Sequence, residues 1–115
     1  YNDETAQARR AAADAYIDAN LADPALAPAA VAAGVFVSLR HLHRLYAMTG
    51  TTVTERIRHA RMQRCQDDLC NPAFAAVPVS AIGARWGMPD AAHFSRAFSA
   101  HFDCPPAAYR RRHLG

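Results

Sequence analysis

Residues 38–46 read SLRHLHRLY, and residues 90–98 read DAAHFSRAF. Each stretch opens on a residue that can cap a helix, and each then places an apolar residue, an arginine and an aromatic residue at every second position. The matching pairs, 52 residues apart, are Leu42/Phe94, Arg44/Arg96 and Tyr46/Phe98. A short apolar segment and a turn of three or four residues precede each stretch. Because a short helix, a tight turn and a second helix form the helix-turn-helix layout, the sequence predicts two such units.

Helix start and stop signals divide the rest of the chain in the same way. Asp23-Pro24, Gly50, Asn71-Pro72 and Gly87 interrupt the helical periodicity. Seven helices are expected, at about residues 5–21, 28–34, 38–50, 52–69, 78–86, 90–103 and 105–112. The last of these is expected to turn Tyr109 inward and Arg110, Arg111 and Arg112 outward. No alternating segment of useful length suggests a strand.

The predicted fold is all-α, with two helix-turn-helix subdomains joined by a long linker helix. Its parts are a first subdomain at 1–50, a linker helix at 51–70 and a second subdomain at 71–115. Twenty-seven alanines among 115 residues favour helix over sheet. A linker of about 18 residues spans roughly 27 Å, and successive major-groove faces of DNA lie roughly 34 Å apart. The linker could therefore hold two recognition helices on one side of a duplex.

Helical geometry decides which side chains of each second helix face outward. If Leu42, Leu45 and Tyr46 face the core, then Arg40, His43 and Arg44 share the opposite face. Arginines on such a face suit the acceptor atoms of guanine and the DNA phosphates. The second helix, with its three phenylalanines inward, presents Ala92, His93 and Arg96, and it offers fewer hydrogen-bond donors.

The charge of the chain is unevenly distributed. Residues 1–39 carry a net charge of −3 and residues 40–115 a net charge of +6, and all 13 basic residues are arginine. A basic segment of this kind favours a polyanionic partner. Three cysteines without a paired spacing, no apolar run of membrane-spanning length and no signal peptide favour a cytoplasmic location without membrane attachment. Because the chain starts at Tyr1 and not at Met, we expect it to be a piece of a longer protein.

The sequence offers little support for catalysis. Asp67 and Asp68 are neighbours on a helix, so their side chains point about 100° apart and cannot share a site. No zinc-protease motif or glycine-rich phosphate loop is present, and His41, His43 and Cys65 lack a familiar zinc spacing. We therefore expect no enzymatic activity, no metal site and no cofactor.

The ordered set of motifs resembles the AraC/XylS family of bacterial transcription regulators over residues 13–112. The pieces that carry the resemblance are Tyr16-Ile17, Leu26, Val31-Ala32, Ser38, Leu42-His43-Arg44-Leu45-Tyr46, Gly50, Ile57, Arg61-Met62, Cys65, Leu69, Val79, Ile82, Trp86-Gly87, His93-Phe94-Ser95-Arg96-Ala97-Phe98, Pro106 and Tyr109-Arg110. The resemblance implies a DNA-binding module of a transcription regulator, often an activator, whose two recognition helices enter adjacent major-groove segments of double-stranded DNA. By position, base-facing roles fall on Arg40, His43, Arg44, Ala91, Ala92, His93 and Arg96. Ser38 and Arg85 are expected to contact phosphates.

The resemblance also implies partners for the full protein. These are RNA polymerase and a small-molecule effector, the latter bound by a separate domain that residues 1–115 do not contain. Three residues depart from the family pattern: Phe36 in the first turn, Gly83 in place of alanine, and Asp103 in place of glycine. Glycine inside a helix costs about 0.5–1 kcal/mol relative to alanine. The departures at Phe36 and Gly83, together with the few donors on the second recognition helix, leave a second hypothesis open, an all-helical protein-interaction module that does not bind DNA.

Overall fold

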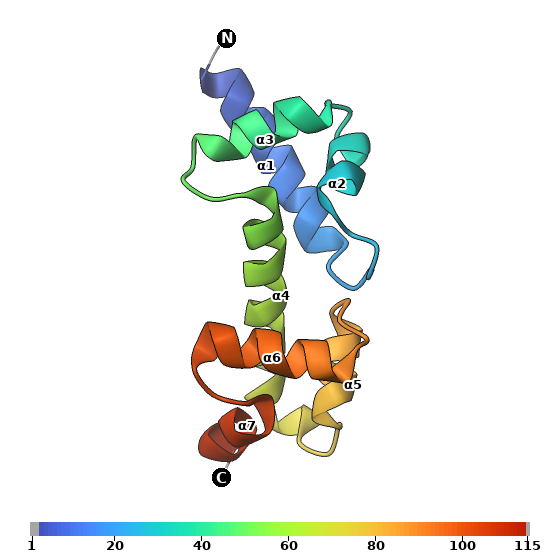
Figure 1. Ribbon diagram of the computed structural model, residues 1–115, viewed down its shortest axis with the longest axis vertical. Coiled ribbons are helices and arrows are strands. Elements are labelled where there is room, and N and C mark those ends of the chain that lie inside the picture. Colours follow the sequence, from blue (N-terminus) through green and yellow to red (C-terminus); the bar gives the residue numbers. More distant parts are fainter. Residues whose placement is uncertain (1–2, 115) are drawn as a thin grey trace. The chain divides into compact units, whose positions relative to one another are not determined.

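The computed structural model describes residues 3–114, and this part of the chain is all-helical, with no strand (Figure 1). Its elements are α1 (Asp3–Ala19), α2 (Pro28–Gly34), α3 (Leu39–Ala47), α4 (Val53–Leu69), a short 3-10 helix η1 (Pro72–Phe74), α5 (Val79–Arg85), α6 (Ala91–Phe102) and α7 (Pro106–Leu114). The seven predicted α-helices are confirmed, with ends that shift by a few residues. The short helix η1, which begins where Asn71 caps a turn, was not predicted from the sequence. No helix in the described range is long and apolar enough to cross a membrane.

The chain forms two compact units, Tyr1–Ala60 and Arg61–Gly115. The boundary falls inside α4, so this helix contributes its first part to one unit and its second part to the other. The apolar positions predicted along α4 are all buried: Ile57 in the first unit, and Met62, Cys65 and Leu69 in the second. The same helix therefore helps to build two separate cores.

The first unit packs α1, α2 and α3 against one another in pairs. The buried side chains of this unit are Ala6, Ala13, Ile17, Leu21, Leu26, Val31, Ala32, Leu42, Leu45, Tyr46, Val53 and Ile57. Ile17, Leu42 and Tyr46 are among the largest of them. Because Leu42, Leu45 and Tyr46 occupy one side of α3, the core fixes which face of that helix remains in solvent.

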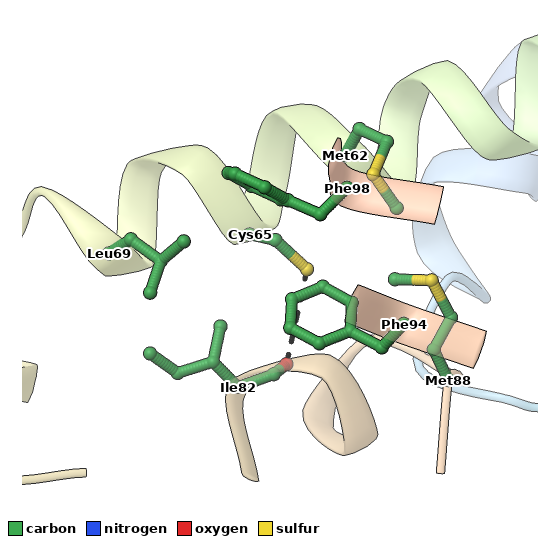
Figure 2. Packing of buried hydrophobic residues seen from close by; sticks show 7 residues of the cluster. All are labelled: Met62, Cys65, Leu69, Ile82, Met88, Phe94 and Phe98. Atoms are coloured by element: carbon green, nitrogen blue, oxygen red, sulfur yellow. Dashed lines mark hydrogen bonds between the residues drawn. The ribbon is translucent and has the colours of Figure 1, made fainter. Parts of the chain in front are cut away.

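The second unit is built around two phenylalanines of α6, which pack against α4 and α5 (Figure 2). Phe94 and Phe98 meet edge to face with ring centroids 5.9 Å apart, a favourable arrangement for aromatic rings. Cys65 lies beside them, with Sγ 4.0 Å from the carbonyl oxygen of Ile82. Burial raises the pKa of the Cys65 thiol to about 12, so it packs as a small neutral apolar group at neutral pH.

The expectation that Arg110 faces solvent is wrong, because its guanidinium is bound to backbone carbonyl groups. Its Nη1 donates to the carbonyl oxygens of Phe74, Ala75 and Val77 at 3.1, 3.0 and 2.7 Å. The guanidinium therefore ties α7 to the end of η1 and to the segment that follows it. Arg111 and Arg112 are exposed, as expected.

Gly83 is required by packing, which revises the expectation that it weakens α5. A Cβ at this position would lie 2.5 Å from Cγ of Phe94, inside the ring's van der Waals envelope. In the first unit the equivalent pair is Ala32 and Leu42, both buried. In the second unit the larger Phe94 on α6 therefore packs on the smaller Gly83 of α5. In the first unit the smaller Leu42 on α3 corresponds to the larger Ala32 on α2.

This size match predicts a double-mutant effect. Gly83→Ala is expected to lower the free energy of unfolding by about 1–3 kcal/mol, because the new Cβ would overlap the buried Phe94 ring and the core would have to shift. The variant Gly83→Ala/Phe94→Leu recreates the pair of the first unit and should lose less than the two single variants together. Urea unfolding of all three variants measures the coupling. Strict additivity would contradict the proposed match.

Candidate nucleic-acid interface

The first turn of α3 is set by Ser38. Its Oγ accepts the backbone N–H of His41 at 3.0 Å, which is the expected N-cap interaction. From this start, the helix buries Leu42, Leu45 and Tyr46 and leaves Arg40, His43 and Arg44 exposed. The three predicted base-facing residues of the first unit therefore share one solvent face.

Polar contacts with α1 and α4 hold the far end of α3. The hydroxyl of Tyr46 donates to Oδ1 of Asp14. Arg56 of α4 lies 3.3 Å from the same oxygen through Nε, and its Nη2 lies 3.2 Å from Oδ1 of Asp18. Burial, followed by the bond to Asp14, raises the pKa of Tyr46. Two acidic residues of the N-terminal segment thus serve the packing of the unit.

The turn between α2 and α3 contains a strained residue. Phe36 has φ +61°, in the left-handed region, and its side chain is 94% exposed. Its counterpart in the second unit is Gly87, with φ +85°. Both turns close with the same backbone bond, from Val37 N to Ala32 O at 3.0 Å and from Met88 N to Gly83 O at 2.9 Å. A left-handed residue that carries a Cβ costs roughly 1–2 kcal/mol, a strain that Gly87 avoids.

The second unit repeats the arrangement, but the exposed face of its second helix has fewer hydrogen-bond donors. Oδ1 of Asp90 accepts the N–H of His93 at 2.9 Å, and this bond lowers the pKa of Asp90. Phe94 and Phe98 face the core. The predicted residues of this unit, Ala91, Ala92, His93 and Arg96, are all exposed. The outer face of α6 therefore carries one arginine, one histidine and two alanines.

The guanidinium groups on both outer faces are available to a ligand. Among the described residues 3–114, no hydrogen bond or ion pair engages Arg40, Arg44 or Arg96. Arg96 is close enough to Asp90 to help to lower the pKa of that carboxyl group.

The two candidate phosphate contacts differ in how strongly they are already held. Ser38 is exposed but caps α3. Arg85 lies 3.7 Å through Nε from Oδ2 of Asp68, and its guanidinium carbon stacks 4.7 Å from the centroid of the Phe74 ring. The Arg85 side chain keeps 53% of its surface exposed. A phosphate at Ser38 would therefore contact a hydroxyl that already caps α3. A phosphate at Arg85 would contact a guanidinium whose charge Asp68 partly neutralises.

Sequence reasoning missed three residues that lie beside Arg40 and Arg44. A hollow of about 600 Å³ in the first unit is lined by both arginines and also by Arg9 of α1, Phe36 and His41. Phe36 had only an indirect signal in the sequence, because it is an aromatic residue where the internal repeat has glycine. For Arg9 there was no signal, because it sits in a segment that is acidic in sum. Within the described range, no group of three histidine, cysteine or acidic side chains could hold a metal ion.

Comparison with known families agrees with this geometry. Residues 31–112 match the family described as "Helix-turn-helix domain". The transcriptional activator NphR from Rhodococcus sp. is 32% identical over 97 residues, which cover 84% of this chain. The matched region spans only 28% of the length of NphR.

Two solved structures share the architecture. A transcriptional regulator from Chromobacterium violaceum, described by its AraC-type DNA-binding domain, superposes with a TM-score of 0.83 at 26% identity and covers 96% of both chains. The C-terminal domain of AraT, a response regulator from Geobacillus stearothermophilus, gives a TM-score of 0.78 at 25% identity, over 87% of this chain and 81% of that one. The likeness therefore extends through both units.

Proposed function

Since the chain belongs to the helix-turn-helix family of AraC-type DNA-binding domains, we propose that it reads one specific site on double-stranded DNA with both of its units. In this proposal α3 and α6 enter adjacent major-groove segments of the same duplex. Arg40, His43 and Arg44 contact base edges from α3, and Ala91, Ala92, His93 and Arg96 do so from α6. Ser38 and Arg85 contact phosphates.

The observation that carries the proposal is the exposed arginine face of α3. Arg40, His43 and Arg44 lie in solvent on a capped helix whose opposite side is fully buried. Arginine presents donors in a planar fork that fits O6 and N7 of guanine, so this face suits a G·C pair in the major groove. The same helix-turn-helix arrangement recurs at α5 and α6 with Arg96 at the position of Arg44.

We divide the module into a first subdomain at 1–50, a linker helix at 51–70 and a second subdomain at 71–115. In the whole protein we expect contact with RNA polymerase, transcription activation, and control by an effector that binds a different domain. Its site of action would be the bacterial nucleoid in the cytoplasm. Neither a cofactor nor enzymatic chemistry has a role in this function.

Selection of binding sites from randomised duplexes tests the proposal. The half-site under the first unit is expected to carry more sequence information than the half-site under the second. The reason is that Ala91 and Ala92 can touch a thymine methyl but cannot donate a hydrogen bond. Log K should also fall with log salt by about 0.9 for each phosphate neutralised.

Two results of the selection would count against this account. Equal information in both halves would refute the asymmetry between α3 and α6. A chain that retains no DNA at low salt, while circular dichroism shows it to be helical, would refute DNA binding and favour a protein-interaction module.

A further inference from the structure

The hollow beside α3 has a composition that points to an anionic ligand. We call it the α1–α3 hollow, and it is formed by α1, the α2–α3 turn and the first two turns of α3. Four of its residues are arginine or histidine, namely Arg9, Arg40, His41 and Arg44, and none of the described residues that line it is acidic. Because Arg40 and Arg44 also belong to the proposed reading face, whatever occupies this hollow lies next to the bases that they read.

Arg9 is positioned at the hollow by a contact across the unit. Its Nη1 lies 3.1 Å from Nε2 of His41, which joins α1 to α3 over 32 residues of sequence. A guanidinium has five N–H donors, so this contact leaves most of them available for a second partner. Arg9 therefore brings a fixed positive charge from α1 to the edge of the recognition helix.

Phe36 adds an apolar surface to the same hollow. A single exposed apolar side chain is common and needs no explanation by itself. Phe36 differs because it combines 94% exposure with a left-handed backbone that Gly87 adopts without strain in the second unit. The turn requires this backbone conformation in both units, but only the first unit places a residue with a side chain there. Residues held in strained backbone conformations cluster at active and ligand-binding sites. The ring thus occupies a costly position from which it can meet a ligand in the hollow.

From these observations we infer that the α1–α3 hollow seats one nucleotide of the DNA backbone, at the edge of the half-site read by the first unit. Arg9 binds the phosphate, and the ring of Phe36 packs on the adjoining deoxyribose. The inference rests on the proposed function and assigns two contacts beyond it. DNA is favoured over an acidic protein segment because the hollow shares Arg40 and Arg44 with the face that contacts bases.

The two contacts have different signatures in a salt titration with a duplex that carries the selected site. Arg9→Ala should weaken binding and reduce the slope of log K against log salt by about 0.9, because one phosphate contact is lost. Arg9→Lys keeps the charge and should retain the slope. Phe36→Gly should weaken binding about 5- to 20-fold, because the apolar contact of the ring is lost. The slope should not change, because the ring neutralises no phosphate.

Thermal unfolding separates the binding role of Phe36 from a structural one. Phe36→Gly relieves the left-handed strain and should raise Tm by roughly 3–6 °C while it lowers DNA affinity. Phe36→Ala keeps a Cβ at the same φ, so it should lose similar affinity with little change in Tm. Met48→Ala, which removes another exposed apolar side chain of the same unit from outside the hollow, is the matched control and should bind as the unaltered chain does.

The outcomes that overturn the inference are distinct from those that overturn DNA binding. If the unaltered chain binds its site and both Phe36 variants bind it with the affinity of the unaltered chain, the hollow does not seat the backbone. An unchanged salt slope for Arg9→Ala would remove the phosphate contact. If Phe36→Gly instead abolishes binding of an acidic peptide and leaves DNA affinity unchanged, the hollow belongs to a protein partner. Absence of any DNA binding by the unaltered chain would reject the proposed function itself.

Discussion

The double variant Arg44→Ala/Arg96→Ala is expected to lose about 2–6 kcal/mol of binding free energy for the selected duplex. A bidentate contact between arginine and guanine contributes about 1–3 kcal/mol of discrimination. The two arginines belong to different units, so their losses should add. The loss corresponds to a decrease in affinity of roughly 30-fold to 25,000-fold, and fluorescence anisotropy with labelled duplexes measures it.

A matched control removes the same number of charges from elsewhere. Arg58 and Arg111 are exposed arginines, one in each unit, outside α3 and α6. Arg58→Ala/Arg111→Ala should lower affinity for all duplexes alike and leave the preference for the selected site intact. If the Arg44/Arg96 variant also weakens all sequences uniformly, both arginines contact phosphates and do not read bases.

The largest effect on stability is expected at Phe98. This side chain is fully buried, and its ring packs against Phe94, Phe102 and Tyr109. Phe98→Ala should lower the free energy of unfolding by about 3–5 kcal/mol, because it removes apolar burial and leaves a cavity. Folded domains of this size are stable by only about 5–15 kcal/mol. The variant should therefore be close to the limit of folding at physiological temperature.

The fluorescence of Trp86 can measure the loss of stability in Phe98→Ala. This residue is the only tryptophan of the chain, and it packs on the Phe98 cluster in the second unit. Its fluorescence during urea unfolding follows that unit directly. Phe36→Ala is the control, because it truncates a phenylalanine that is 94% exposed and should leave the urea midpoint almost unchanged. A loss below about 1 kcal/mol for Phe98→Ala would show that the cluster does not hold the second unit together.

The helices and their buried faces were predictable because local signals determine them. Prolines, glycines and capping residues such as Ser38 and Asp90 act within one turn of chain, and both caps form as expected. The periodicity that placed Leu42 and Tyr46 in the core also required Arg40 and Arg44 to face solvent. This part of the candidate site could be predicted because one helix carries both its buried and its exposed side chains.

Contacts between helices far apart in sequence could not be predicted in the same way. Arg110 meets carbonyl groups 33 to 36 residues away, and Arg9 meets His41 across 32 residues. No local pattern distinguishes either arginine from its exposed neighbours. Gly83 looked unfavourable from helix propensity alone, because the space that it leaves for Phe94 is a property of packing. Tertiary contacts overrode the local preference at this position.

The claim that both units read one duplex is tested most directly by missing-contact footprints on the selected site. The unaltered chain, Arg44→Ala and Arg96→Ala are compared on the same DNA. Each variant should lose contacts in a different segment, and the two segments should lie about one helical turn, or roughly 10 base pairs, apart on one face of the duplex. Loss of the same segment in both variants, or an Arg96→Ala footprint identical to that of the unaltered chain, would contradict the account.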